Sequence, residues 1–142
     1  MKEKLKMKPI QNTLNLVGRL LLVALFLPAG LTKLTGFAGT VGYFGSLGIP
    51  APTLAVVVTI LIEVLGSIAL LVGFQTRVVA IVMAIFTLAA SIAGHAYWAA
   101  PADQAFVAQL LFFKNIAVIG GLLVLASAGA GAFSVDGQKS KQ

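Results

Sequence analysis

The sequence of 142 residues contains no cysteine, and it has only one histidine and four acidic residues. The lack of cysteine excludes disulfides, thiolate nucleophiles and cysteine-ligated iron–sulfur clusters. A dedicated metal site gathers three or four ligands, and a haem with two histidine ligands needs more than one histidine. We therefore expect no intrinsic metal, haem or iron–sulfur centre, so that any redox chemistry would need a bound cofactor or a partner subunit.

Charge is scarce as well. Charged residues make up 10% of the chain and hydrophobic residues 59%, and the mean hydropathy is +1.02. A soluble domain carries about 25% charged residues, so this chain lacks the polar surface to face water on all sides. The composition predicts an integral membrane protein. We expect an all-α fold, because a lone segment inside a bilayer must satisfy its backbone hydrogen bonds internally.

Four long apolar segments predict a bundle of four membrane-spanning helices, since about 20 residues cross a bilayer. The segments are residues 14–34, 51–74, 77–98 and 105–128, and together they define a membrane domain over 14–128 between a basic tail (1–13) and a C-terminal tail (129–142). No A-x-A-like cleavage site is clear, so we expect the first segment to remain as a helix. The glycine-rich stretch after it carries apolar residues at helical spacing and predicts a short interfacial helix.

The net charge of +6 is concentrated in the two tails. Arg77 lies between the second and third segments, on the side of the membrane that both tails share, while the two opposite loops contain no lysine or arginine. This is the distribution of the positive-inside rule, which predicts that both termini are cytoplasmic, and it does not indicate a nucleic-acid partner. The tail lysines are Lys2, Lys4, Lys6, Lys8, Lys139 and Lys141.

A small set of ionisable residues interrupts the apolar segments. Glu63 lies near the predicted midplane, Lys114 within one helical turn of that level, and Arg19 on the cytoplasmic side of the first segment. A charge at such depth costs at least ~2.5–3.5 kcal/mol, so it usually has a partner or a function. Together with Asn115 these residues predict a buried polar cluster. The sequence leaves open whether Glu63 pairs with Lys114 or with Arg19, and whether it fixes the bundle or handles a proton.

A second set of polar residues lies toward the predicted outer face. Lys33 and His95 fall near the outer ends of the first and third segments. With Tyr43 and Tyr97 they form a candidate ligand pocket on that face. The alternative for His95 is an interfacial position within an ordinary aromatic belt beside Tyr97 and Trp98.

Several ordered motifs resemble the DoxX family of small bacterial four-helix membrane proteins. The resemblance runs from about Gly18 to Asp136, and the GHAYW segment is similar to the YphA-like inner-membrane subgroup of that family. The stretches that carry it are GRLLLVALFLPAGLTKLTGFAGTVGYFGSLGIP, IEVLGSIALLVGFQTR and FFKNIAVIGGLLVLASAGAGAFSVD. The resemblance implies a multi-pass protein of the bacterial cytoplasmic (inner) membrane.

The resemblance leaves the activity open. Some relatives are associated with thiosulfate:quinone oxidoreduction or with oxidative-stress complexes, and most have no assigned activity. One hypothesis is an accessory membrane protein that binds a ligand or a partner membrane or redox protein. Another is the membrane subunit of a quinone-linked oxidoreductase, in which Lys33, His95 and Tyr97 line a quinone site and Glu63 handles the proton. A small transporter is a third, and it would require homo-oligomerisation to make room for alternating access.

Overall fold

The computed structural model describes residues 8–139 and confirms an all-α fold over that range. Lys2, Lys4, Lys6 and Lys141, which entered the topology prediction, lie outside the described residues. The elements are α1 (Pro9–Thr35), α2 (Phe37–Ser46), α3 (Pro52–Val72), α4 (Thr76–Gly94), the short 3-10 helix η1 (Tyr97–Ala99), α5 (Ala105–Ala128) and α6 (Val135–Lys139).

The four predicted spans correspond to α1, α3, α4 and α5, each of which is long and apolar enough to cross a membrane. Prolines start two of them, where a missing N–H is harmless: Pro9 in α1 and Pro52 in α3. α1 begins before the predicted start at Leu14 and continues through Pro28. The short helix expected after the first span is α2.

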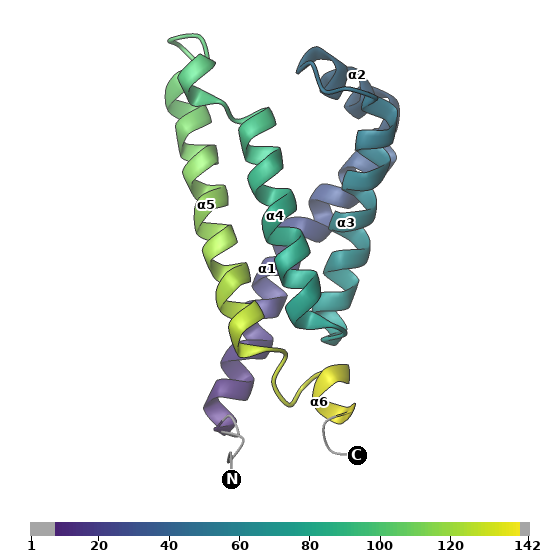
Figure 1. Ribbon diagram of the computed structural model, residues 1–142, viewed down its shortest axis with the longest axis vertical. Helices are drawn as coiled ribbons and strands as arrows, with labels where there is room; N and C mark the ends of the chain where they lie inside the picture. Colours follow the sequence, from purple (N-terminus) through teal and green to yellow (C-terminus); the bar gives the residue numbers. More distant parts are fainter. Residues whose placement is uncertain (1–7, 140–142) are drawn as a thin grey trace.

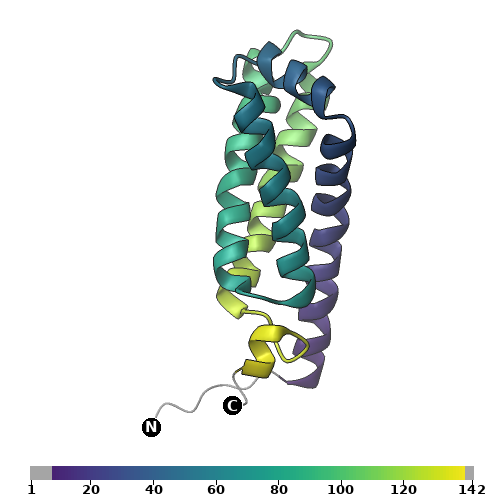
Figure 2. The same cartoon turned by 90° about the vertical axis from the view of Figure 1, so that its right-hand side faces the viewer.

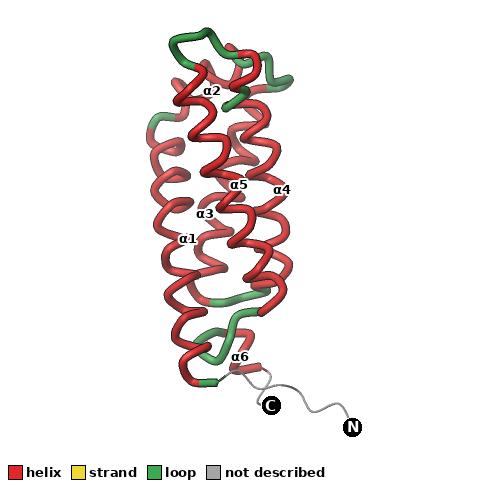
Figure 3. Tube along the Cα trace, turned by 90° about the vertical axis from the view of Figure 1, so that its left-hand side faces the viewer, coloured by secondary structure: helices red, strands yellow, loops and turns green. Residues whose placement is uncertain are grey.

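The helices form two closely packed pairs. α1 packs along α3 and α4 along α5, while contacts between α3 and α4 join the pairs. α1 begins, α5 ends and α6 lies at one end of the bundle, here called the terminal end (Figure 1). At the opposite end, here called the far end, α2 lies over the ends of α1 and α3 (Figures 2 and 3), and η1 packs against α5. Toward the far end α3 leans away from α5 (Figure 1), so the two pairs separate there.

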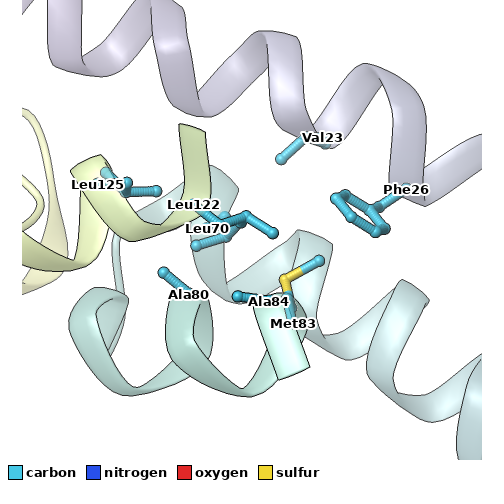
Figure 4. Close-up of a cluster of buried hydrophobic side chains, with 8 residues drawn as sticks. All are labelled: Val23, Phe26, Leu70, Ala80, Met83, Ala84, Leu122 and Leu125. Carbon is cyan, nitrogen blue, oxygen red and sulfur yellow. The ribbon is translucent and has the colours of Figure 1, made fainter. Parts of the chain in front are cut away.

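The close-packed core lies in the half nearer the terminal end. Leu70, Met83 and Leu122 are fully buried there, on three different helices (Figure 4). Gly66 lets α4 approach α3, because a Cβ at this position would lie 2.9 Å from Met83 Sδ. The whole cluster comprises Val23, Phe26, Leu70, Ala80, Met83, Ala84, Leu122 and Leu125.

Side chains at the terminal end satisfy backbone groups that helix ends leave unpaired. The Arg77 guanidinium donates to the carbonyls of Ala126, Ser127 and Ala128, the last residues of α5. A cation at a helix C-terminus also complements the helix dipole. Arg77, whose positive charge fits the positive-inside rule, therefore also caps the C-terminus of α5.

Asp136 caps the N-terminus of α4. Its two carboxylate oxygens accept hydrogen bonds from the backbone N–H groups of Gln75 and Thr76, each at 2.9 Å. Its own N–H donates to the carbonyl of Gly73 at 3.0 Å. Gly73 has φ +71 and meets Ser134, so a side chain would be strained and obstructed there. The segment after α5 thus fastens the α3–α4 turn, and the terminal end is closed.

Candidate functional site

The only ion pair among residues 8–139 joins Lys33 to Glu63. Lys33 Nζ lies 3.1 Å from Glu63 Oε1 and 3.0 Å from Oε2, and it also lies 3.5 Å from the Ala29 carbonyl. The Glu63 side chain is 7% exposed and that of Lys33 is 26% exposed. The sequence offered Lys114 and Arg19 as alternative partners of Glu63. The structure corrects both alternatives, because the partner is Lys33 in the last turn of α1.

The close approach of α1 to α3 explains this pairing. Gly30 lies one turn before Lys33, and a Cβ there would be 2.7 Å from Val64 Cγ2 and 2.9 Å from Glu63 Cβ. The missing side chain brings the α1 backbone against α3 at the level of Glu63. The next turn of α1 then carries Lys33 within reach of the carboxylate, because the lysine stem can lie along apolar surface.

Arg19 is fully buried and lies at the terminal end, away from the ion pair. Its Nη1 donates to the carbonyls of Leu70 and Leu71 at the end of α3, at 2.9 and 3.2 Å, and its Nη2 donates to Phe133 at 2.5 Å. Its Nε donates to Asn15 Oδ1 at 3.1 Å. Arg19 thus satisfies helix-end carbonyls instead of a carboxylate, which suits a guanidinium with five donors in a fixed fork.

A pocket of about 470 Å³ occupies the far half of the bundle, between α1–α3 and α4–α5. That volume falls in the range of small-molecule sites, roughly 300–1,000 Å³. The pocket brings together most of the polar residues that the sequence singled out: Lys33, Tyr43, Glu63, His95, Lys114 and Asn115. The predicted cluster and the predicted outer-face pocket are therefore parts of one cavity, without Arg19.

The walls of the pocket are mostly apolar or small. Large side chains come from α1, α2 and α4, and alanines and a glycine line the far half of α4. Thr59 and Thr87 also line it, and their hydroxyls donate to the carbonyls of Ala55 and Met83 at 2.8 and 2.7 Å. These hydroxyls therefore satisfy their own protons within the helix. The other lining residues are Leu25, Phe26, Ala29, Phe44, Leu47, Ile49, Ala55, Phe86, Ala89, Ala90, Ala93 and Gly94.

Lys114, Asn115 and His95 contribute polar groups from the α4–α5 side. Lys114 is exposed and Asn115 is half-buried. His95 follows the last turn of α4, where its backbone N–H donates to the Ser91 carbonyl at 2.9 Å. The α4–α5 side of the cavity thus carries the Lys114 ammonium, the Asn115 amide and, just after α4, the His95 ring.

Tyr97 does not line the pocket. Its ring packs against Trp98, Phe112 and Phe113, with centroid distances of 5.2, 5.5 and 5.9 Å. This cluster joins η1 to α5 at the far end of the bundle. Within residues 8–139 no group of three or more His, Cys, Asp or Glu side chains is placed to hold a metal ion.

Comparison with known proteins identifies a family and several relatives that are similar to this chain. The DoxX family model matches residues 14–96. The inner membrane protein YphA of Escherichia coli is 38% identical over 121 residues, which cover 85% of this chain and 86% of YphA. The inner membrane protein YqjF of the same organism is 40% identical over 130 residues, covering 92% of this chain and 95% of YqjF.

A more distant relative is the ER-derived vesicles protein ERV29 of Saccharomyces cerevisiae, 28% identical over 81 residues that make up 57% of this chain and 26% of ERV29. No solved structure matches the chain. The names of the two bacterial relatives confirm the predicted location in an inner membrane. The family match, the two long bacterial alignments and the four spanning helices agree, and the chain belongs to the DoxX family.

Proposed function

We propose that this inner-membrane protein is a non-enzymatic accessory protein that binds one amphipathic small molecule in the pocket of its far half. The observation that carries the proposal is the cavity of about 470 Å³ with mostly apolar walls, into which the partly buried Lys33–Glu63 pair, Lys114 and Asn115 bring polar groups. Such a combination, apolar walls with a few convergent polar groups, is the usual composition of a small-molecule site.

The contrast between the two halves of the bundle supports this proposal. The terminal half is close-packed, and the guanidinium groups of Arg19 and Arg77 bind backbone carbonyls of the protein there. The far half has small residues on α4 where large ones would fill the space. A bundle that needed only stability would gain from a packed far half, since voids forfeit contacts among their lining atoms.

The location of the pocket relative to the membrane follows from the topology that we propose. With both termini in the cytoplasm, as the positive-inside rule predicts, the far half of the bundle and its pocket lie toward the outer face. The ligand would then enter from the outer leaflet or the aqueous phase beyond it.

A quinone-linked oxidoreductase subunit is the second candidate. It is favoured by one observation: Lys33, Glu63 and His95 line the same cavity, so a quinone carbonyl oxygen would lie near the Lys33 ammonium and the His95 ring, with the Glu63 carboxylate as a nearby proton acceptor. Tyr97, which the sequence placed at that site, is not available for this role because it packs in the aromatic cluster.

Analysis of the molecules that co-purify with the protein tests both candidates. We expect an organic extract of the purified chain to contain one amphiphile at near-stoichiometric amount. Ala93→Trp fills the pocket and should remove it, while the matched variant Ala117→Trp, at an exposed position on α5 outside the pocket, should retain it. A quinone in the extract would favour the second candidate. An extract whose composition is the same for both variants would contradict a ligand site in this pocket.

A further inference from the structure

The charge of Lys114 indicates what kind of molecule the pocket binds, an inference that rests on the proposed ligand-binding function. Lys114 follows the start of α5 by nine residues, or about 14 Å along the helix axis, which is near the middle of a hydrocarbon core of about 30 Å. Its side chain is exposed and lines the pocket. A charge at this depth costs about 2.5–3.5 kcal/mol or more unless something compensates it.

No acidic side chain of the described chain compensates Lys114. Glu63 is engaged by Lys33 through both carboxylate oxygens. Asp136 lies at the terminal end, where it binds the first backbone N–H groups of α4. Asp103 is exposed in the loop before α5 begins, so the helix itself separates it from Lys114.

The pocket therefore carries one unbalanced positive charge. Lys33 and Glu63 cancel each other, and His95 is neutral in its ordinary state near pH 7. Lys114 remains, and beside it Asn115 can donate from its amide. A ligand with one negative charge would neutralise the site and replace the hydration of the ammonium by a charge-assisted hydrogen bond.

The remainder of the pocket suits a hydrocarbon chain. Besides Lys114 and Asn115, the lining includes the alanines of α4 and the rings of Phe26 and Phe86. We propose that the ligand is an anionic amphiphile, with a carboxylate or phosphate head between Lys114 and Asn115 and its apolar chain along Ala89 and Ala93 of α4. The cavity volume suits one chain of such a molecule. Both a free fatty acid and an anionic membrane lipid have this chemistry.

Binding of two probes with the same tail tests the inference. Dodecyl phosphate carries an anionic head and dodecanol a neutral one, and both can be titrated into the purified full chain in a non-ionic detergent by calorimetry. We expect dodecyl phosphate to bind at least ~10-fold more tightly, since a hydrogen bond to a charged group contributes about 1.5–3 kcal/mol. Lys114→Met should lower the affinity for dodecyl phosphate to that for dodecanol and leave dodecanol binding unchanged.

The control variant is Lys139→Met, which removes a cation outside the pocket, over the Phe74 ring, and should preserve the preference. Equal affinity of the wild-type chain for the two probes would overturn the anionic head group and leave the proposed function standing. Binding of neither probe would overturn both. The comparison on the wild-type chain decides the question even where Lys114→Met fails to fold.

A third arm distinguishes the source of the ligand. The protein is placed in nanodiscs of phosphatidylcholine with or without phosphatidylglycerol and examined by native mass spectrometry. Selective retention of phosphatidylglycerol by the wild-type chain, lost in Lys114→Met, would assign a membrane lipid. Displacement of a bound fatty acid by dodecyl phosphate would assign a free carboxylate. Retention of phosphatidylcholine alone would overturn the anionic assignment.

Discussion

Breaking the Lys33–Glu63 ion pair should destabilise the bundle, and the effect should depend on which member of the pair is changed. The pair is made by one ammonium and both oxygens of a carboxylate, at 3.0 and 3.1 Å, and the Glu63 side chain is 7% exposed. Removing one member of a buried pair costs about 3–5 kcal/mol because the other charge is left unpaired. We expect Lys33→Met to approach the upper part of this range. Glu63→Gln should cost less, because the remaining ammonium is 26% exposed.

A double-mutant cycle measures the interaction itself. The free energy of unfolding in mixed detergent micelles is determined for Lys33→Met, Glu63→Gln and the double variant. We expect the double variant to be more stable than additivity predicts by about 1–3 kcal/mol, the range for contacting residues. The matched cycle with Lys114→Met and Glu63→Gln should be additive within about 0.5 kcal/mol. Coupling of Glu63 to Lys114 with none to Lys33 would refute the pairing that the structure shows.

Three further predictions follow from the packing and the topology. Gly30→Ala should lower the free energy of unfolding by about 1–3 kcal/mol because the added Cβ meets α3, whereas Gly120→Ala, whose Cβ would have nothing within 4 Å, should leave it unchanged or raise it by up to ~1 kcal/mol. Equal effects of the two substitutions would contradict the close approach of α1 to α3. Asp136→Ala should cost about 0.5–2 kcal/mol and speed proteolysis of the segment after α5, since the N-terminus of α4 loses its cap; unchanged proteolysis would argue against the clasp. Because the chain has no cysteine, Ala102→Cys should react with a membrane-impermeant maleimide in intact cells and Gln138→Cys only after lysis; the reverse pattern would overturn the proposed topology.

The spanning helices could be predicted from the sequence because their length and hydropathy are distinctive. Long apolar runs, a scarcity of charge and the three polar residues from Gln75 to Arg77 predict the spans and the α3–α4 hairpin. The ends are less clear, because the polar first turn of α1 around Gln11 and Asn12 does not read as part of an apolar span. Such a turn forms at the terminal end, where Asn12 accepts a hydrogen bond from Ala132.

The partner of Glu63 was not predictable from depth along each helix. That estimate treats the spans as level with one another, and it places Lys33 too far toward the far end to meet Glu63. The actual contact depends on how closely α1 approaches α3, which a single glycine decides. Gly30 and Lys33 stand together in the DoxX-like motif, and their spacing of three residues on one helix face was the available signal.

The role of Arg19 was missed for a different reason. A buried arginine is expected to pair with a carboxylate. The backbone carbonyls at the end of α3 are equally suitable acceptors, and the identity of the side chains does not reveal them.

Tyr97 was assigned to the same pocket as His95, but the backbone between them turns the two side chains to different places. The chain leaves the α-helix after Gly94, and η1 turns Tyr97 onto the aromatic side chains of α5.

Photo-crosslinking with a diazirine-bearing amphiphile tests the central claim, a ligand site in the far half of the bundle, most directly. The label is added to the purified protein, activated, and mapped by peptide mass spectrometry. We predict saturable crosslinks on α4 between Phe86 and Gly94, competed by unlabelled amphiphile and lost in Ala93→Trp. Non-saturable crosslinks spread over lipid-facing positions such as Phe106 and Leu110, unchanged in Ala93→Trp, would contradict the account.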